Sequence, residues 1–379
     1  MSEKITLFLA ETAPETPCLV VDLDVVEQNY LHLARLLPAV DIYYAVKANP
    51  APPILERLGR IGANFDAASI HEVESLRAVG IPAERICFGH TVKKQTHIAR
   101  AHELGVHLFA FDSTLELEKL SAAAPGAQVY CRFLMGGEGA DWPLSEKFGC
   151  QPGMARDLLA KAASMGLEPH GVSFHVGSQQ RDPGQWGIAL GIAAEIFADL
   201  SARGIDLAMV NLGGGFPAGY RAPAPPLATY AAAITDGVAR HFTNNLPAII
   251  AEPGRYLAGD AGIIQTEVVL ISRKSRESDE QERRWVYLDI GRFGGLVEVM
   301  DESIQYRLRT PHDGGPTGPV IIAGPTCDEV DVLYDGAGYH MPLDLAVGDK
   351  VDILSTGAYT ASYCSVGFNG FPPLREYYI

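Results

Sequence analysis

The first two-thirds of the chain alternates short apolar runs with stretches whose apolar residues recur at helical spacing. The runs read IYYAVKA, NFDAAS, ICFGH, LFAFDS, VYCRFL, GVSFHVG, MVNLGGG and AIIAEPGR, and they begin at Ile42, Asn64, Ile86, Leu108, Val129, Gly171, Met209 and Ala248. Before the first run, one helical face carries Val26, Tyr30, Leu33 and Leu37. Each run is therefore predicted to be a buried strand that is followed by a helix.

Strands that alternate with helices predict parallel pairing through right-handed crossovers. Eight such units within about 240 residues predict a TIM-type (β/α)8 barrel, an α/β fold, over residues 22–261. A doubly wound open sheet is the alternative that this pattern leaves open.

From about residue 261 the helical pattern fades and strand-forming segments follow one another. These segments read GIIQTEVVLISRK, RRWVYLDIG, GPVIIAG and GDKVDILSTGAY. We predict an antiparallel β-domain, similar to a sandwich or barrel, that combines residues 1–21 with residues 262–379. The hydrophilic segment Arg273–Arg284 and the Gly- and Pro-rich segment Thr310–Pro319 are predicted to be exposed loops.

Charge and composition exclude several classes of function. The chain of 379 residues has a formal net charge of −16, so neither a nucleic-acid nor a membrane partner is expected. No apolar run could span a bilayer, and the N-terminal segment lacks the basic region of a signal peptide. The six cysteines are widely spaced and form no CxxC pair, which predicts no metal site and suits the cytoplasm.

The carboxyl ends of the predicted barrel strands carry polar residues of complementary chemistry. In a TIM-type barrel these ends converge on one face, where the active site lies. In chain order the side chains are Lys47, Asp66, His90, Asp112, Arg132, His175, Glu252 and Arg255, and Gly213–Gly215 ends the seventh strand.

This set of groups fits pyridoxal phosphate. The cofactor needs a lysine for a Schiff base, a phosphate site, and an acid at the pyridine nitrogen. Lys47 supplies the amine, and Glu252 could keep the nitrogen protonated. Gly213–Gly215 exposes backbone N–H groups to a phosphate, to which Arg255 and Ser178 could add charge and a hydrogen bond. Each group alone is more often structural; their joint placement on successive strands favours a site.

Eight motifs resemble one family. They read YYAVKANP, NFDAASIHEV, SEKFG, FHVGSQ, NLGGGFP, AEPGRY, GPTCDEVDVL and GAYTASYCSVGFNGF, and they span nearly the whole chain. The chain resembles the fold-type III pyridoxal-phosphate decarboxylases, which share an alanine-racemase-like barrel, and within them the ornithine/lysine decarboxylase branch.

The resemblance implies roles for individual residues. Lys47 would carry the cofactor, His175 would stack on its ring, and Glu252 would face the ring nitrogen. The remaining cofactor contacts would come from Asp66, Arg132, Ser178, Gly214, Gly215, Pro253, Gly254, Arg255 and Tyr359, with Lys147 in support.

The resemblance also implies a homodimer whose active sites are shared between two subunits. Cys327 from the partner would protonate the α-carbon after CO2 leaves, and Asp328 would bind the distal amine of a diamino acid. Asp301 is a second candidate for that amine, and Glu302 remains an alternative to it. Tyr359 and Phe368 would complete the substrate site.

The expected reaction is decarboxylation of L-ornithine to putrescine, a step of polyamine biosynthesis, with L-lysine or both amino acids as the alternative. Diaminopimelate decarboxylases typically carry CES where this chain has CDE, and biosynthetic arginine decarboxylases are far longer. A racemase would need an acid–base residue on each face of the α-carbon. A non-catalytic regulator of the antizyme-inhibitor type would not require Lys47, Glu252 and Cys327, which are all present.

Overall fold

The computed structural model of the protein describes residues 1–142, 147–243, 246–275 and 282–379. Two compact units make up the chain. The barrel unit comprises Glu27–Pro217 and Ala224–Tyr256, and the β unit comprises Met1–Val26, Ala218–Pro223 and Leu257–Ile379. Two of the boundaries between the units fall within helices α2 (Leu23–Leu36) and α10 (Arg255–Ala258), and the other two flank the segment Ala218–Pro223.

The barrel unit contains a closed ring of parallel strands. The ring runs β2 (Val40–Ala45), β3 (Asn64–Ala67), β4 (Ile86–Phe88), β5 (Leu108–Phe111), β6 (Gln128–Arg132), β8 (Glu168–Ser173), β10 (Met209–Asn211) and β11 (Ala248–Ala251). It closes where β11 pairs in parallel with β2, with Ile250 opposite Asp41. The predicted (β/α)8 barrel is confirmed, and closure of the ring excludes the open doubly wound sheet.

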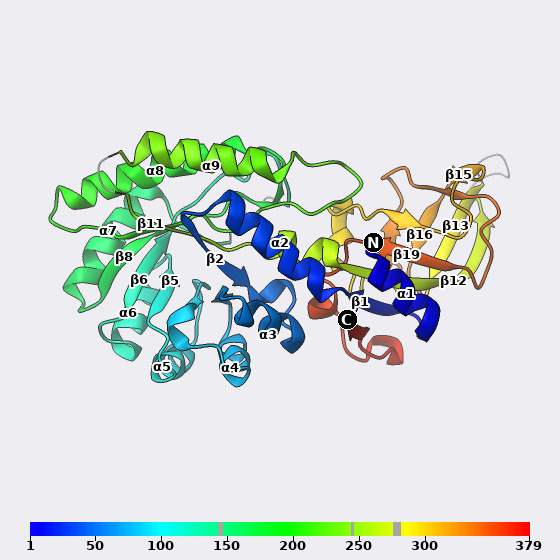
Figure 1. The fold of residues 1–379 in the computed structure, drawn as a ribbon, viewed down its shortest axis with the longest axis horizontal. Helices are drawn as coiled ribbons and strands as arrows, with labels where there is room; N and C mark the ends of the chain where they lie inside the picture. Colours follow the sequence, from blue (N-terminus) through cyan, green and yellow to red (C-terminus); the bar gives the residue numbers. More distant parts are fainter. Residues whose placement is uncertain (143–146, 244–245, 276–281) are drawn as a thin grey trace. The chain divides into compact units, whose positions relative to one another are not determined.

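Helices follow most of these strands and lie outside the ring (Figure 1). They are α3 (Pro52–Arg60), α4 (Ile70–Ala78), α5 (Gln95–Glu103), α6 (Thr114–Ala123), α7 (Pro152–Ser164), α8 (Gly184–Ser201) and α9 (Leu227–His241). In helix α3, Pro52 stands in the first turn, where the backbone N–H groups have no partner within the helix, so the missing N–H of proline costs no hydrogen bond. Ile54, Leu55 and Leu58 form the buried face of this helix. A short ribbon of β7 (Ala140–Trp142) and β9 (Ser178–Gln180) is added to the barrel unit.

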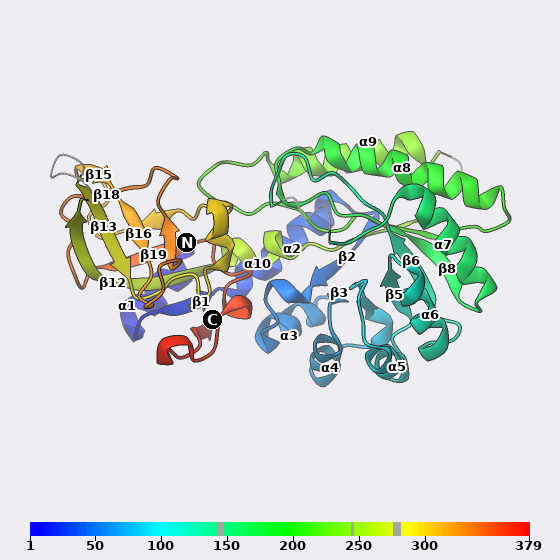
Figure 2. The same ribbon diagram turned by 180° about the vertical axis from the view of Figure 1, so that it is seen from behind.

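The β unit is built on an eight-stranded sheet, seen from behind in Figure 2. Its strands are β1 (Cys18–Val21), β12 (Gly262–Lys274), β13 (Arg283–Leu288), β14 (Leu308–Arg309), β16 (Ile321–Ala323), β17 (Val332–Tyr334), β19 (Lys350–Leu354) and β20 (Arg375–Tyr378). Most pairs are antiparallel, as predicted, but β1 pairs in parallel with β20, and β13 pairs in parallel with β16. Strands β15 (Thr317–Pro319) and β18 (His340–Pro342) form a separate antiparallel pair.

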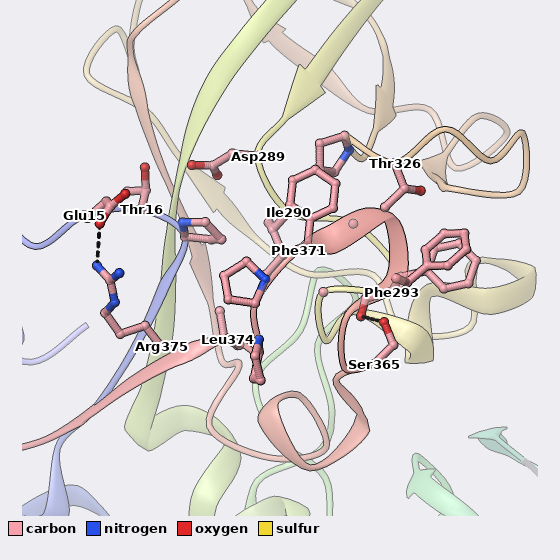
Figure 3. Close-up of a pocket in the computed structure, with 17 residues that line it drawn as sticks. Glu15, Thr16, Asp289, Ile290, Phe293, Thr326, Ser365, Phe371, Leu374 and Arg375 are labelled. Atoms are coloured by element: carbon pink, nitrogen blue, oxygen red, sulfur yellow. Dashed lines mark hydrogen bonds and ion pairs between the residues drawn. The ribbon is translucent and has the colours of Figure 1, made fainter.

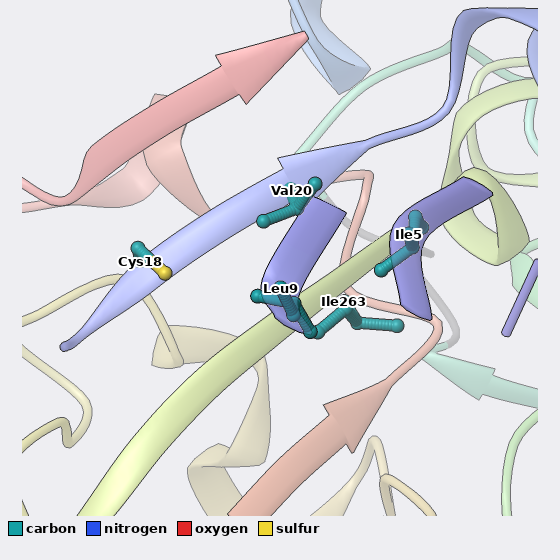
Figure 4. Close-up of a cluster of buried hydrophobic side chains, with 5 residues drawn as sticks. All are labelled: Ile5, Leu9, Cys18, Val20 and Ile263. Carbon is teal, nitrogen blue, oxygen red and sulfur yellow. The ribbon is translucent and has the colours of Figure 1, made fainter. Parts of the chain in front are cut away.

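The N-terminal segment lies in the β unit, where β1 pairs with β12. It also forms a helix that the sequence pattern did not reveal, α1 (Glu3–Thr12), which is capped by the Ser2 side chain. Ile5 and Leu9 of this helix pack against Cys18, Val20 and Ile263 (Figure 4). Two buried positions in ten residues gave too weak a periodic signal to predict this helix.

The two predicted loops have different outcomes. Of Arg273–Arg284, residues 276–281 lie outside the described residues, and the flanking positions Lys274 and Arg283 pair across β12 and β13. Thr310–Pro319 is a loop that ends in strand β15. Among the described helices, none has the length and apolar character needed to cross a bilayer.

Candidate active site

Lys47 lies at the carboxyl end of β2, in the single 3-10 turn Val46–Ala48. Its Nζ is 3.2 Å from Oδ2 of Asp66, which lies on the neighbouring strand β3. Asp66 is buried, whereas the Lys47 side chain is exposed. The expected amine and one of the expected acids therefore meet at the same end of the barrel.

Glu252 follows directly after β11 and lies beside Asp66. Carboxylate oxygens of both residues and the Cys87 thiol are all within 4.8 Å of one another. Burial, and after it the charge of Asp66, raises the pKa of Glu252 to about 7. Burial also holds the pKa of Cys87 well above its ordinary value, so this thiol remains neutral, 3.7 Å from Oδ1 of Asp66. Glu252 can therefore give up or take back its proton near neutral pH when a basic group lies beside it.

Asn211, the last residue of β10, was missed by the sequence analysis. It is fully buried, and its Nδ2 donates a hydrogen bond to Oε1 of Glu252. Its Oδ1 accepts the N–H of Gly213 at 2.9 Å, and the Glu252 N–H donates to the Gly213 carbonyl at 2.8 Å. A polar residue ending the run MVN was visible in the sequence, but nothing there identified its partners.

The glycine triplet after β10 leaves no space for side chains. A Cβ atom would lie 2.2 Å from the Phe174 carbonyl oxygen at Gly213 and 2.8 Å from the Glu252 carbonyl oxygen at Gly214. Gly213 and Gly215 also have φ angles of +63° and +98°, which favour glycine. The loop therefore presents bare backbone, as a phosphate-binding loop must.

His175 follows β8 and packs beside this loop. Burial, with Arg132, Lys47 and Arg255 nearby, holds the pKa of His175 well below its ordinary value. Its Nδ1 accepts the N–H of Gly177 at 3.0 Å, so the proton of the neutral ring is on Nε2. The side chain is consequently a flat, uncharged ring, which suits stacking on an aromatic cofactor.

Arg255 and Ser178 are brought together from different parts of the sequence. The Nε and Nη2 atoms of Arg255 donate to the Ser178 hydroxyl at 3.2 and 3.0 Å. Arg255 is buried, and Pro253 and Gly254 before it are buried as well. A buried guanidinium beside a hydroxyl is the donor set expected for a phosphate.

The remaining expected barrel residues gather around Phe148, an aromatic residue that the sequence analysis did not select. The Phe148 ring lies 5.4 Å from the Arg132 guanidinium, 5.4 Å from the His90 ring and 5.1 Å from Lys147 Nζ. Burial lowers the pKa of Arg132. Asp112 holds the same loop by accepting the Gly149 N–H at 2.8 Å. Ser145 and Glu146 of the SEKFG motif lie outside the described residues.

Glu72 is a second carboxyl group that the sequence analysis missed. Its Oε2 accepts the Ala68 N–H at 2.6 Å, and its own N–H donates to the Ser69 hydroxyl. Burial raises its pKa to about 7, and Asp66 adds to the effect. In the sequence, Ser69 and Glu72 have the spacing of a helix capping box, which explains the glutamate without reference to a site.

In the β unit, Cys327 and Asp328 lie on an exposed loop after β16. The Cys327 N–H donates to Oδ1 of Asn369 at 2.8 Å, and Oδ1 of Asp328 accepts the Val330 N–H at 3.0 Å. Buried Asp331 closes the loop: its carboxylate accepts both the N–H and the hydroxyl of Thr326, at 3.1 and 2.6 Å. The fold thus holds the backbone of this loop and leaves the thiol exposed.

The other expected residues of the β unit have separate local environments. Tyr359 has a φ angle of +56°, and its ring lies 5.9 Å from that of Tyr363. The Phe368 ring lies 4.5 Å from that of Phe293. Both phenylalanines line a cavity of about 310 Å³ that lies wholly within the β unit, also lined by Phe371 (Figure 3).

The barrel residues fit the cofactor. Lys47 supplies an amine, the glycine loop would be blocked by any Cβ atom, and Arg255 with Ser178 forms an anion-binding pair. Glu252, whose pKa is raised to about 7, can exchange a proton with a ring nitrogen. These residues match the three groups of pyridoxal phosphate that a protein contacts: the aldehyde, the phosphate and the pyridine nitrogen.

Comparison with known proteins supports the same conclusion. A family model described as "Pyridoxal-dependent decarboxylase, pyridoxal binding domain" matches residues 23–259. The lysine/ornithine decarboxylase of Selenomonas ruminantium is 36% identical over 373 residues, which cover 98% of this chain and 91% of that protein. The ornithine decarboxylase of Mus musculus is 30% identical over 372 residues, covering 95% and 80%.

Solved structures extend the similarity to three dimensions. A lysine/ornithine decarboxylase from Vibrio vulnificus complexed with cadaverine has a TM-score of 0.87 at 31% identity, and the match covers 100% of this chain and 99% of that one. The arginine decarboxylase of Paramecium bursaria Chlorella virus bound to agmatine has a TM-score of 0.89 at 28% identity, covering 100% of both chains.

Proposed function

The chain belongs to the pyridoxal-dependent decarboxylases, and we propose that it converts L-ornithine to putrescine and CO2, with L-lysine as its second substrate. One observation carries the choice of substrate. Among the exposed carboxylates of the β unit are those of Asp301 and Asp328, and Cys327, whose side chain is also exposed, directly precedes Asp328 in the chain. Two acids suit a distal ammonium group, as carried by ornithine and lysine.

The barrel residues hold and orient the reacting groups. Bound pyridoxal phosphate supplies an electron sink for the electrons that the departing carboxylate leaves behind. Glu252 would hold a proton at the ring nitrogen, and the hydrogen bond from Asn211 to Oε1 would determine which Glu252 oxygen is available for that contact. Arg255 and Ser178 would bind the phosphate, and the neutral His175 ring would pack on the ring of the cofactor. Asp66 orients the amine of Lys47.

Proton delivery is the role proposed for Cys327. After CO2 leaves, the α-carbon needs one proton from an acidic group within reach. The exposed Sγ of Cys327 can carry that proton, while the bond from its N–H to Asn369 holds the backbone in place.

We propose that the working unit is a homodimer in which this loop serves the active site of the other subunit. Support comes from large apolar side chains that are exposed on the β unit, where contact with water is unfavourable. Val330, Tyr363, Val366 and Phe371 are exposed by 56, 49, 80 and 42%, respectively.

The relatives from Vibrio vulnificus and Selenomonas ruminantium are named lysine/ornithine decarboxylases, and these names favour ornithine and lysine as the substrates of this chain.

The substrate proposal is tested by kcat/KM for ornithine, lysine, arginine and diaminopimelate. Ornithine and lysine should lead, separated by less than about 200-fold, because one methylene changes binding by only about 1–3 kcal/mol. Diaminopimelate carries a distal carboxylate, which Asp301 and Asp328 would repel. A preference for diaminopimelate or arginine over both diamino acids would refute the proposal.

A further inference from the structure

Two cysteines that the proposed mechanism does not use lie side by side in the barrel unit. The Sγ atoms of Cys131 and Cys150 are 3.7 Å apart, and both residues are free thiols. Cys131 is completely buried in β6, whereas Cys150 is 5% exposed. The two residues are 19 positions apart in the chain, so the fold brings their thiols together.

The backbone explains why these side chains meet. Cys150 pairs with Phe133 in an isolated parallel bridge. The Cys150 N–H donates to the Arg132 carbonyl at 3.0 Å, and the Cys150 carbonyl accepts the Leu134 N–H at 2.9 Å. Cys131 precedes Phe133 by two residues, so both side chains point to the same side of the strand. Cys150, which lies opposite Phe133, therefore presents its thiol to Cys131.

The two thiols differ in how easily they react. The Cys150 thiol donates to the Arg132 carbonyl at 3.6 Å, which leaves Cys131 as the donor between the two sulfurs. Burial, and after it the contact with Cys150, holds the pKa of the Cys131 thiol well above its ordinary value. Cys131 therefore stays protonated, and Cys150, which has some exposed surface, is the sulfur that a small oxidant reaches first.

We propose that a hydroperoxide such as hydrogen peroxide oxidises Cys131 and Cys150 to a disulfide, and that this disulfide weakens binding of the cofactor. In the first step the Cys150 sulfur attacks the peroxide, the O–O bond breaks, and Cys150 becomes a sulfenic acid while one water leaves with the thiol proton. In the second step the Cys131 sulfur attacks the Cys150 sulfur and the S–O bond breaks. The Cys131 proton leaves with the hydroxyl group as a second water. The two thiols lose two electrons, which reduce one peroxide to two waters.

The new bond would displace the residues next to Cys150. The sulfurs of a disulfide are about 2.0 Å apart, so the two side chains must approach each other. Cys131 lies within the closed ring, between Phe111 of β5 on one side and Val172 of β8 on the other. The displacement therefore falls mainly on Cys150 and on Phe148, which lies two residues before it.

Phe148 links this displacement to the cofactor residues. Its ring lies 5.4 Å from the guanidinium of Arg132, which is one of the residues expected to contact the cofactor. The adjacent Gly149 is held by Asp112, which accepts the Gly149 N–H at 2.8 Å. A shift of Cys150 would strain this bond and remove the packing that holds the Arg132 side chain in position.

The experiment uses the holoenzyme with Cys327→Ser, because the exposed Cys327 thiol would itself react with peroxide. The protein is treated with hydrogen peroxide and digested without reduction, and mass spectrometry identifies any peptide that links Cys131 to Cys150. The rate of cofactor loss on dialysis is followed in the same samples by absorbance. Cys150→Ala removes one member of the pair, and Cys18→Ala, at a buried cysteine of the β unit, is the matched control.

We expect peroxide-treated C327S protein to yield the linked peptide, about 2 Da lighter than its two reduced parts together. It should lose cofactor about threefold faster or more than the untreated protein, and dithiothreitol should restore the slower rate. C18A in this background should behave in the same way. C150A in this background should form no linked peptide, and peroxide should leave its rate of cofactor loss unchanged.

Two results would overturn the proposal. The first is the absence of the linked peptide at a peroxide dose that fully oxidises Cys327 in the wild-type chain, which would show that burial protects the pair. The second is a linked peptide without faster loss of cofactor, or equally accelerated loss in C150A, which would show that the pair does not act on the cofactor site. Oxidised and re-reduced C327S protein can be compared directly, so the test holds even if C150A folds poorly.

Discussion

The Nζ of Lys47 lies 3.2 Å from Oδ2 of Asp66, and the two side chains differ sharply in exposure, at 46% and 2%. The acid is a fixed part of the barrel wall, whereas the amine reaches it from the rim. Asp66 can therefore orient Lys47 while the amine remains accessible for bond formation.

The first prediction concerns this pair. Lys47→Ala should abolish covalent attachment of the cofactor, so that borohydride reduction followed by peptide mass spectrometry finds no modified lysine. Asp66→Asn keeps the shape but removes the charge, and it should weaken cofactor binding by about tenfold or more. Asp41→Asn, at an exposed position of β2, should have no effect. Covalent cofactor retained by Lys47→Ala would contradict the assignment.

The second prediction concerns pH. Burial and the charge of Asp66 raise the pKa of Glu252 from 4.5 to about 7, so the folded protein binds a proton there that the unfolded chain has already released. The stability from this group is complete below pH 4.5 and is lost as pH rises through 7. The free energy of unfolding of the cofactor-free protein should thus fall with pH across this window, by up to about 1.4 kcal/mol per pH unit for one proton.

Glu252→Gln should flatten that slope, because the amide does not titrate. Glu72→Gln should act in the same direction, since burial raises the pKa of Glu72 to about 7 as well. Glu84→Gln, at an exposed position of the barrel unit, should leave the slope unchanged. Denaturant unfolding between pH 5 and 8 measures the effect, and identical slopes in wild type and Glu252→Gln would refute it.

The third prediction separates the two hydrogen bonds of Asn211. Asn211→Ala removes both and should weaken cofactor binding by about tenfold to a hundredfold, because it leaves buried groups unpaired. Asn211→Asp keeps the acceptor for the Gly213 N–H but replaces the donor to Glu252 with a negative charge. It should raise the pKa of Glu252 further, which is seen as a shift in the pH dependence of the bound cofactor's absorbance. Equal behaviour of the two variants would show that Glu252 is not the partner that matters.

Much of the barrel could be predicted because its signal is local. Buried parallel strands are apolar along their length, and their carboxyl ends point to one face, so Lys47 and Asp66 could be placed together without knowing the packing. The contacts that side chains make across the site could not be predicted in this way. Asn211 and Cys87 form hydrogen bonds with residues that are distant in sequence, and the sequence around Glu72 looks like an ordinary helix cap.

The β unit shows the same limit in its backbone. Glu302 accepts a hydrogen bond from the Asp335 N–H in the turn after β17, and no local sequence pattern encodes that contact. Likewise, Asp331 lies in a motif whose resemblance pointed to Cys327 and Asp328, but its own burial became apparent only from the fold. The sequence therefore points to candidate reactive groups more directly than to the residues that hold them in place.

The last prediction tests the shared active site. Lys47 belongs to the barrel unit and Cys327 to the β unit, so a site built from two subunits would take one residue from each chain. Lys47→Ala and Cys327→Ala homodimers should both be severely impaired. When they are mixed in equal amounts under subunit exchange, half of the dimers should be hybrids, and each hybrid contains one intact site. Activity should then recover to about a quarter of wild type.

If each active site were built within one chain, no mixture could restore activity, because every site would carry one of the two substitutions. Exchange must be verified independently, for example by mass spectrometry of differently tagged subunits. Verified hybrids that remain inactive would refute the shared site and leave the assignment of Lys47 intact.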